Sequence, residues 1–239
     1  MSGHSKWANI KRRKGAQDAL RSNVFQKLAK EIYVAAKAGD KDPNNNPNLR
    51  MVIDKAKAQN MPKDRIQNAI DKASKQTGGD DFEAVRYEGY GPSGIAIMVD
   101  CLTDNKNRTA PEVRSAFSKR GGNLGTDGSV AYMFERKGVI IIDKSYDEEE
   151  IMMTVIDAGA EDFNANDDNY EIITSYDKFI DVKKALENLG IENFEVSEIT
   201  FIPTNEIEVD ENTKEKVLNL VETLEDNEDV QNVYHNMKE

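Results

Sequence analysis

The strongest constraint on the fold lies in residues 138–202, where strand-like and helix-like hydrophobic patterns alternate in a fixed order. Short apolar runs mark the strands, and Ser145 with Glu148 forms a capping box ahead of the first helix. The order is βαββαβ, the ferredoxin-like split unit. We expect strands at residues 138–143, 161–165, 170–175 and 194–202, and helices at residues 147–158 and 178–189.

Residues 22–77 have a different pattern, with apolar side chains at helical spacing. Asp42-Pro43 breaks the first stripe, Asn46-Pro47 suits the start of a second helix, and Pro62 opens a third, which ends before Gly78-Gly79. A small three-helix domain is expected. Its three stripes are Val24, Phe25, Leu28, Ala29, Ile32, Tyr33 and Ala36; Leu49, Val52, Ile53 and Ala56; and Ile66, Ala69, Ile70 and Ala73.

The remaining segments cannot bury their apolar faces alone. From about residue 84 the pattern changes to strand-like; residues 95–102 read as a buried strand, and Thr109 with Glu112 as a capping box. Gly121-Gly122 stops that helix, and further elements are expected at residues 130–134 (strand), 211–225 (helix capped by Asp210) and 229–235 (strand).

Together these segments predict a second α+β sandwich, into which the βαββαβ unit is inserted. The predicted fold class is α+β, with an N-terminal three-helix domain and two ferredoxin-like α+β domains, one inserted in the other. The expected domains are residues 1–80 (basic tail and helices), residues 81–136 with 204–239 (discontinuous), and residues 137–203 (inserted).

Charge is distributed unevenly along the chain. Residues 1–80 carry 17 Lys and Arg against 8 Asp and Glu, whereas residues 141–239 carry 7 against 28, and the net charge is −12. A basic head on an acidic body is typical of a polyanion-binding end whose remainder limits indiscriminate adhesion. The alternative is that both sets of charges are merely solvated.

Several classes of protein are disfavoured by composition. The single cysteine, Cys101, cannot form an internal disulfide or a multi-cysteine metal site, and no apolar run exceeds about five residues, against the roughly 20 of a membrane helix. No apolar segment follows the basic N-terminal residues, so a secretory signal is not expected. We expect a folded, soluble, cytoplasmic protein without membrane contact.

The first 30 residues supply the main candidate binding site. Residues 1–21 contain six basic side chains and one acidic one, Asp18. Each cation that binds a phosphate releases condensed counterions, which favours binding. Trp7 can stack on an unpaired base; alternatively it anchors the tail to the body. The predicted nucleic-acid contacts here are Lys6, Trp7, Asn9, Lys11, Arg12, Arg13, Lys14, Arg21, Lys27 and Lys30.

A second contact is expected in the loops of residues 104–129. Four glycines within residues 121–129 permit close backbone approach to a ligand, but the loop lacks the Gly-Lys-Ser/Thr ending of a P-loop, and turn geometry explains at least half of them. The predicted cations are Lys106, Arg108, Arg114, Lys119 and Arg120, of which Lys119 and Arg120 equally suit a helix C-terminus.

Signals of catalysis are weak. His4 and His235 lie near opposite ends of the chain, in contexts expected to be mobile, so a histidine triad or zinc site would have to form at the termini. The acidic runs 147–150 and 225–229 read as helix-end or hydrated carboxylates and lack the pattern of an EF-hand. We expect no catalytic residues, no metal and no cofactor.

Five segments resemble one known family. Residues 3–14 (Gly-His-Ser-Lys-Trp-Ala-Asn-Ile-Lys-Arg-Arg-Lys) resemble the opening of the YebC family, which includes the mitochondrial translational activator of cytochrome c oxidase subunit I, and the resemblance continues through residues 30–37, 87–94, 104–109 and 121–132. It spans essentially the whole chain and implies three domains, one helical and two α+β. The opening differs from the shorter basic one of a sister subgroup.

The resemblance implies two possible roles. Members are commonly described as DNA-binding transcriptional regulators, while others act in translation at the ribosome, relieving stalling. No helix has a clear Arg, Asn and Gln face for reading bases, and a basic tail on an acidic body suits folded RNA among basic proteins, so we favour RNA and the ribosome over DNA. A small-molecule-binding regulator and a phosphate-handling enzyme are further alternatives.

Overall fold

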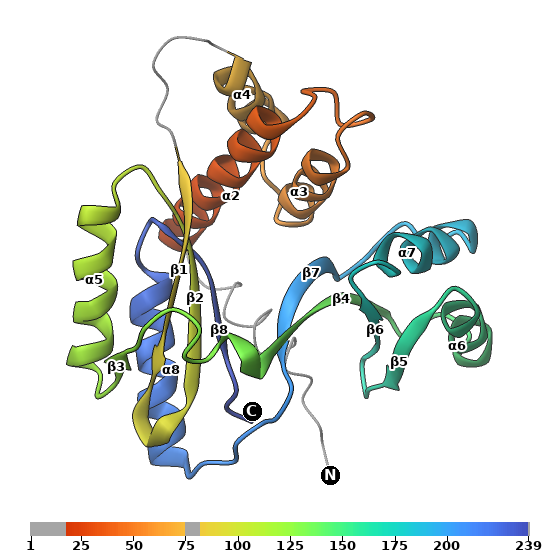
Figure 1. Ribbon diagram of the computed structural model, residues 1–239. Coiled ribbons are helices and arrows are strands. Elements are labelled where there is room, and N and C mark those ends of the chain that lie inside the picture. The colour runs from red at the N-terminus through yellow and green to blue at the C-terminus, as the bar shows by residue number, and fades with distance from the viewer. Residues whose placement is uncertain (1–17, 75–81, 239) are drawn as a thin grey trace. The chain divides into compact units, whose positions relative to one another are not determined.

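The computed structural model describes residues 18–74 and 82–238 (Figure 1). The described chain divides into two compact units, of which one is residues 135–202 and the other joins the residues before 135 to those after 202. Within these described ranges, no helix is long and apolar enough to cross a membrane. The finer division into three domains, with boundaries near residues 80, 136 and 203, stays a prediction.

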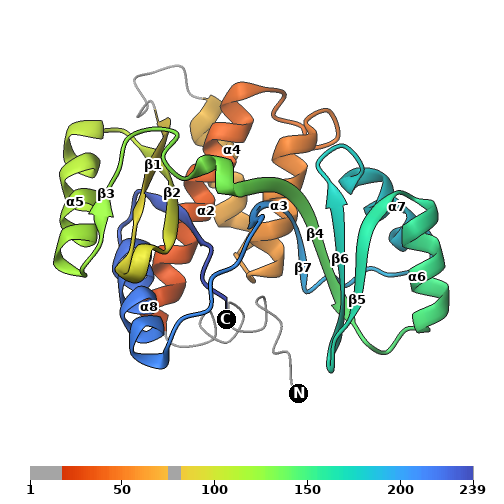
Figure 2. The same cartoon turned by 60° about the horizontal axis from the view of Figure 1, so that its bottom comes forward.

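The unit of residues 135–202 has the predicted ferredoxin-like layout. Its strand order is β5-β6-β4-β7, β6 runs antiparallel to both β4 and β5, and both helices lie on one face of this sheet (Figure 2). The elements are β4 (Phe134–Asp143), α6 (Glu148–Asp157), β5 (Ala160–Ala165), β6 (Asn169–Ser175), α7 (Phe179–Asn188) and β7 (Val196–Pro203).

Strand β4 buries apolar side chains on both faces of this sheet. A Cβ atom on Gly138 would lie 2.3 Å from Thr174 Oγ1 and 2.5 Å from Phe179 Cδ2, so the strand and α7 approach too closely for any side chain there. Because successive residues of a strand point to opposite faces, Val139 and Ile141 lie on the side away from α7, in a separate cluster. That cluster includes Ile173, Val196 and Ile202.

The N-terminal helices form a bundle around the three predicted stripes. The helices are α2 (Asp18–Ala38), α3 (Pro47–Ala58) and α4 (Lys63–Ser74). Asn46 caps α3, since its Oδ1 accepts a hydrogen bond from Leu49 N at 3.1 Å, and Pro47 occupies the first turn. Leu28, Ile32, Leu49, Ile53, Ile66 and Ile70 lie at the centre of the core.

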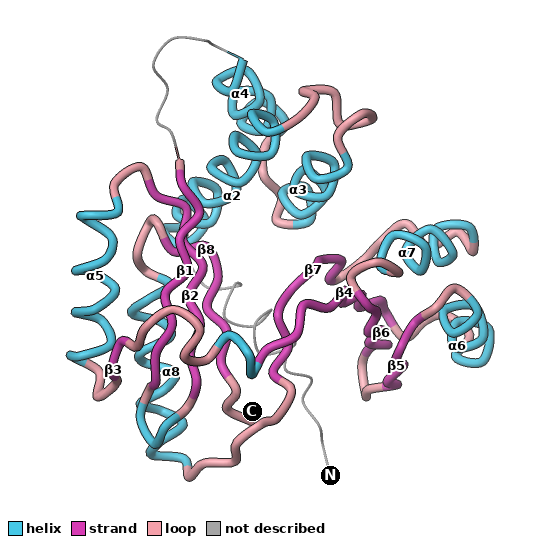
Figure 3. Tube along the Cα trace, viewed as in Figure 1, coloured by secondary structure: helices cyan, strands magenta, loops and turns pink. Residues whose placement is uncertain are grey.

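A second four-stranded sheet completes this unit, and Figure 3 shows its strands in magenta with helices α5 and α8 beside them. The strand order is β3-β1-β2-β8, which repeats the layout of the other sheet with β1 in the place of β6. Both helices contribute to one core, through Phe117 of α5 and Leu220 of α8 against Ile97 and Val99. The elements are β1 (Glu83–Tyr90), β2 (Ala96–Thr103), α5 (Lys106–Lys119), β3 (Asn123–Leu124), α8 (Glu211–Glu225) and β8 (Val230–His235).

Both predicted capping boxes are wrong. Helix α5 begins at Lys106 because Asn105 caps it, its Oδ1 accepting from Arg108 N at 3.2 Å, and Thr109 is already inside the helix. Helix α6 is capped by Asp147, which accepts from Glu150 N at 2.9 Å. In both helices the cap is the Asn or Asp that directly precedes the first helical residue, and its side chain accepts from a free backbone amide of the first turn.

The predicted strand at residues 130–134 is also wrong, since residues Ala131–Met133 form a short 3-10 turn and β4 begins only at Phe134. The backbone amides of Val130 and Ala131 donate to the Glu88 carboxylate at 2.8 and 2.7 Å. They are therefore unavailable for a strand ladder. Asp210 caps α8 as predicted, accepting from Thr213 N at 2.9 Å.

Candidate nucleic-acid interface

The predicted contacts of the tail lie outside the described residues or at their edge. Lys6, Trp7, Asn9, Lys11, Arg12, Arg13 and Lys14 precede residue 18, where the described chain begins. Arg21 belongs to α2, but its side chain is not described. The tail therefore stays a predicted contact.

Lys27 and Lys30 point from α2 to the turn between α8 and β8. Lys27 Nζ donates to the carbonyl of Glu225, and burial lowers the pKa of this lysine despite the acidic residues nearby. Lys30 Nζ donates to Glu228 O and to Asp229 Oδ1, both at 2.9 Å. Both predicted contact residues thus have partners within the protein, and a phosphate would have to compete with them.

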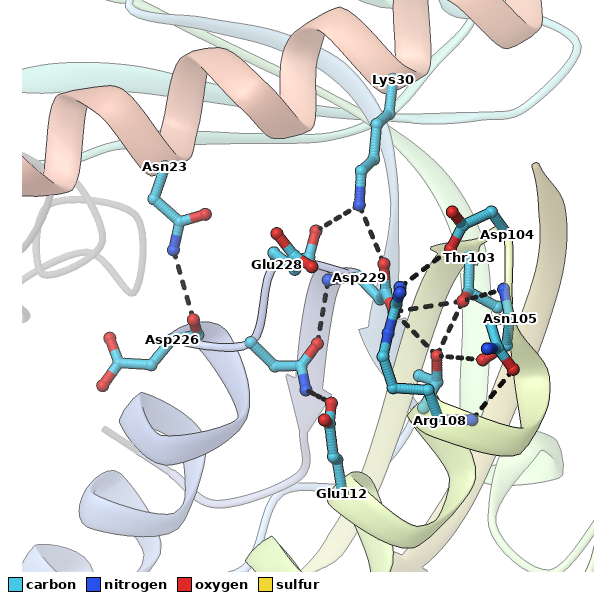
Figure 4. A network of polar contacts seen from close by, with 12 residues as sticks. Asn23, Lys30, Thr103, Asp104, Asn105, Arg108, Glu112, Asp226, Glu228 and Asp229 are labelled. Atoms are coloured by element: carbon cyan, nitrogen blue, oxygen red, sulfur yellow. Dashed lines mark hydrogen bonds and ion pairs between the residues drawn. The ribbon is translucent and has the colours of Figure 1, made fainter. Parts of the chain in front are cut away.

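Asp229 is the centre of a buried polar cluster, which we call the Asp229 cluster: Lys30, Thr103, Arg108, Thr109 and Asp229. The carboxylate is fully buried, and Arg108 Nη2 lies 2.7 Å from Oδ2 (Figure 4). The hydroxyls of Thr109 and Thr103 lie 2.8 and 3.1 Å from the same oxygen.

The charged form of Asp229 is favoured by these partners. Burial alone would raise its pKa, but hydrogen bonds from Arg108, Lys30 and Thr109 outweigh burial and lower the pKa to about 2. The expectation that the acids of residues 225–229 are all helix-end or hydrated carboxylates is therefore wrong for Asp229. Nothing in the local sequence distinguishes this residue from its exposed neighbours, because its partners are distant along the chain.

Arg108 and Lys106, two further predicted contacts, are also paired. Arg108 Nη2 bridges Asp229 and Asp104, the second contact at 2.9 Å, and the hydrogen bond to Asp229 raises the arginine pKa above its ordinary value. Lys106 pairs with Glu83. These ion pairs join the start of α5 to β1 and to the α8–β8 turn.

The other predicted cations of α5 are exposed. Arg114, Lys119 and Arg120 all face solvent, although Arg120 Nε also donates to Thr223 Oγ1 at 3.1 Å. Lys119 borders a shallow groove of about 340 Å³ between α5 and α8. Arg114 and Lys119 are the residues of this set that present a cation most directly to a ligand.

Helix α4 presents a polar face that sequence reasoning missed. Arg65, Gln67, Asn68 and Lys72 are exposed, and the three- and four-residue spacing of Arg65, Asn68 and Lys72 places them on one side of the helix. Asp64 and Asp71 lie among them, and Gln67 Nε2 donates to Asp71 Oδ1 at 2.9 Å. The signal was the helical spacing of these polar residues, but the interleaved acids obscured it.

The glycine-rich loop is organised by a carboxylate of the protein itself. Glu88, which is only 5% exposed, accepts from the backbone amides of Gly128, Val130 and Ala131 at 2.7–2.8 Å. Burial raises the pKa of Glu88, but the three amide hydrogen bonds together lower it more. An anion already occupies the amides that a phosphate would use, so this part of the loop is structural; Gly128, with φ +80°, permits the turn.

The candidates for catalytic chemistry are dispersed. Cys101 is buried, and burial raises its pKa to about 12, so its thiol is not a ready nucleophile. His235 lies in β8 opposite Ile97 and is 9% exposed, which corrects the expectation of a mobile context. Among the described residues, no cluster of His, Cys, Asp and Glu could hold a metal ion.

Comparison with known proteins gives matches over nearly the full length. A probable transcriptional regulatory protein of Geobacillus kaustophilus is 54% identical over 242 aligned positions, covering 100% of this chain and 98% of that protein. One from Bacillus licheniformis is 57% identical, covering 99% and 100%. A crystal structure of a conserved hypothetical protein from Aquifex aeolicus has a TM-score of 0.86 and 44% identity, covering 98% of this chain and 97% of that one.

Family models agree with the relatives and with the fold. Residues 5–76 match the model described as the TACO1/YebC protein N-terminal domain, and residues 82–237 match that of the TACO1/YebC second and third domain. The two matches meet across the short segment between α4 and β1. With a helical bundle, two ferredoxin-like sheets and relatives more than half identical, the chain belongs to the TACO1/YebC family.

Proposed function

We propose that this chain is a non-enzymatic regulator of gene expression that binds nucleic acid through residues 6–30, and that its main target is RNA on the ribosome. The observation that carries the proposal is the charge asymmetry: residues 1–80 hold 17 of the 32 basic residues, whereas residues 141–239 hold 28 of the 44 acids. Cations concentrated at one end provide the electrostatic part of nucleic-acid affinity.

The internal contacts of Lys27, Lys30 and Arg108 favour the earlier cations of residues 6–30, before residue 22, as the main contact. Lys27 donates to a backbone carbonyl of the α8–β8 turn, and Lys30 and Arg108 pair with Asp229, so a phosphate would bind them only at the cost of these native contacts. The tail cations Lys11 and Arg12 belong to a run of four basic residues with no acid among them. We propose exposed Arg114 and Lys119 as the secondary contact.

RNA fits the charge layout better than a duplex read in the major groove. A helix that reads DNA lies against two phosphate backbones, and Asp64 and Asp71 on the exposed face of α4 would meet those phosphates. Folded RNA is recognised largely by shape, stacking and phosphate contact, for which Trp7 and the neighbouring cations are suited. The acidic remainder would be tolerated among basic ribosomal proteins.

A DNA-binding transcriptional regulator is the second candidate. Two observations favour it: the relatives from Geobacillus and Bacillus are named probable transcriptional regulatory proteins, and α4 exposes Arg65, Gln67 and Asn68, which are residue types that read base edges. The same tail cations would bind duplex DNA without sequence preference. A gel shift alone therefore does not separate the two functions.

Sedimentation with ribosomes separates them. At physiological salt and with excess duplex DNA as competitor, we expect the full-length protein to sediment with ribosomes at a saturable stoichiometry. Trp7→Ala combined with alanine at Lys11, Arg12 and Arg13 should abolish this binding, because it removes the stacking ring and about three phosphate contacts.

The matched control removes three cations outside the basic head, by alanine at Lys178, Lys184 and Lys216, all of which are exposed. This control should still sediment with ribosomes. A footprint on a discrete promoter that survives excess random DNA, with no enrichment on ribosomes, would replace the RNA proposal with the DNA one.

A further inference from the structure

Exposed apolar side chains are concentrated in one part of the molecule. Of the eight large apolar side chains exposed in the described chain, six fall within residues 152–189. They include Met153 at 62% exposure and Ile156 at 54%, values far from the near-zero exposure of core residues. The six are Met152, Met153, Ile156, Tyr176, Ile180 and Leu189.

Helix α6 turns three of these side chains to the same side. Ile151 and Val155 are buried and hold the helix on its sheet. Met152, Met153 and Ile156 occupy positions three, four and seven residues after Glu149, so they form one continuous ridge on the outer face. Helix α7 packs beside α6, and its Ile180 is 48% exposed. We call Met152, Met153 and Ile156 the outer apolar ridge.

The fold itself does not require this ridge. Helices α5 and α8 cover the other sheet in the same arrangement, yet neither has an exposed large apolar side chain. The outward positions of those helices hold residues such as Arg114, Lys119 and Glu215. Exposed apolar surface costs solubility, so its presence on α6 and α7, and on neither α5 nor α8, indicates a contact.

The charges around the ridge are acidic. Helix α6 contains Glu148, Glu149, Glu150 and Asp157 and has no basic residue, and Asp147 caps it. The surrounding unit, residues 135–202, holds 18 acids and 6 bases. A partner must therefore bring positive charge as well as an apolar side chain.

We propose that the outer apolar ridge is a docking surface for a lysine- and arginine-rich protein segment that carries apolar anchor residues. The apolar face of such a segment covers the ridge, and its cations lie against Glu148, Glu149 and Glu150. Methionine side chains are flexible and polarisable, and they adapt to apolar partners of different shape. This contact is separate from the nucleic-acid contact proposed above and does not depend on it.

Charge excludes the other occupants of such a surface. A symmetric contact with the same ridge of a second copy would place like charges opposite each other. An anionic membrane or a nucleic acid would be repelled by the same carboxylates. A basic amphipathic segment satisfies both the apolar and the acidic parts of the surface.

The test uses the full-length protein and a fluorescent amphipathic peptide of leucine and lysine at physiological salt, read by anisotropy. Two double variants should each weaken binding roughly tenfold or more: Met153→Ser with Ile156→Ser removes the apolar ridge, and Glu149→Lys with Glu150→Lys inverts the rim. Melting curves of the first variant should match the wild type, because both side chains are exposed.

Matched controls make the same changes elsewhere. Tyr132→Ser with Ile207→Ser removes two exposed apolar side chains outside α6 and α7, and Glu211→Lys with Glu215→Lys inverts two exposed acids of α8. Both controls should keep wild-type affinity, and a leucine–glutamate peptide should not bind. The proposal fails if the controls weaken binding as much as the ridge variants. It also fails if Met153→Ser abolishes self-association, or if the ridge binds anionic vesicles instead of the basic peptide.

Discussion

The two four-stranded sheets share a layout but are held together differently. The sheet of residues 135–202 comes from one continuous stretch, whereas the other collects β1 to β3 from before that stretch and β8 from after it. The discontinuous sheet buries two carboxylates, Glu88 and Asp229, while the described residues of the continuous one bury no carboxylate at all. Buried charge is found where distant segments must be held together.

The geometry of Asp229 explains the difference. Its carboxylate contacts Lys30 and Thr103, which are 199 and 126 positions away in the sequence. Apolar burial is non-directional and leaves such segments free to slide, whereas a hydrogen-bonded carboxylate fixes one arrangement. In the continuous unit short connections already limit the arrangements, so an apolar core is sufficient.

The largest effect is expected from Asp229→Ala. The change leaves the buried hydroxyl of Thr103 without its acceptor, while Thr109 keeps the carbonyl of Asn105. It also removes the buried charge that Lys30 and Arg108 share. We expect a loss of about 3 to 5 kcal/mol in the free energy of unfolding, measured by urea denaturation. Hydrogen exchange should rise in α2, the start of α5 and β8, and stay unchanged within residues 135–202.

The matched control is Asp226→Ala, which removes an exposed carboxylate three positions earlier and leaves the Asp229 cluster intact. It should change stability by less than about 0.5 kcal/mol. Equal effects of the two substitutions would mean that the cluster has no special part in joining the discontinuous unit.

A somewhat smaller effect is expected from Gly138→Ala in the continuous unit. The added methyl group would meet Thr174 and the Phe179 ring at less than 3 Å, so the strand or α7 must shift. We expect a loss of about 2 to 3 kcal/mol, with exchange increased in β4, β6 and α7 and unchanged around Asp229. Glu135→Ala, at the exposed start of the same strand, is the control. Increased hydrogen exchange around Asp229 in Gly138→Ala would mean that the two units do not open separately.

Much of the fold was predictable because its signals are local. The βαββαβ order of residues 138–202 and the three apolar stripes of α2 to α4 follow from periodicity and turn residues within each segment. Strand β1 was not resolved as a separate element, because Glu88 and Gly89 interrupt its apolar pattern. Both residues have tertiary reasons to be there: Glu88 binds the loop amides, and Gly89 lies against Phe117.

The candidate site was less accessible to sequence reasoning. A count of cations identifies Lys30 and Arg108 as basic residues, but it does not reveal that a single buried carboxylate contacts both. Pairing depends on three-dimensional proximity across more than 100 positions, and no local spacing encodes it. The outer apolar ridge could not be predicted from the sequence, because the methionines of α6 are compatible with either face of a helix. The burial of Ile151 and Val155 shows which face is exposed.

The pH dependence of unfolding isolates the charge of Asp229. Its pKa is about 2 in the folded protein, below the ordinary value of 3.8, so its stabilising contribution is complete only above about pH 5 and is lost as the pH falls towards 2. A depression of that size corresponds to roughly 2 kcal/mol of stability. Asp229→Asn should be less stable at neutral pH and show a shallower loss between pH 5 and 2, measured by urea denaturation. Parallel pH profiles of the free energy of unfolding for the wild type and Asp229→Asn would contradict a stabilising charge at Asp229.

The smallest effect on stability is expected from Arg114→Ser with Lys119→Ser, on the exposed side of α5. Both side chains face solvent, so the free energy of unfolding should change by less than about 0.5 kcal/mol. If they form the secondary nucleic-acid contact, the slope of log affinity against log salt should become shallower by about 0.7 for each lost contact to single-stranded RNA. The control, Met153→Ser with Ile156→Ser on α6, should leave both stability and salt slope unchanged. Equal salt slopes for the α5 variant and the wild type would confine the phosphate contacts to the basic tail.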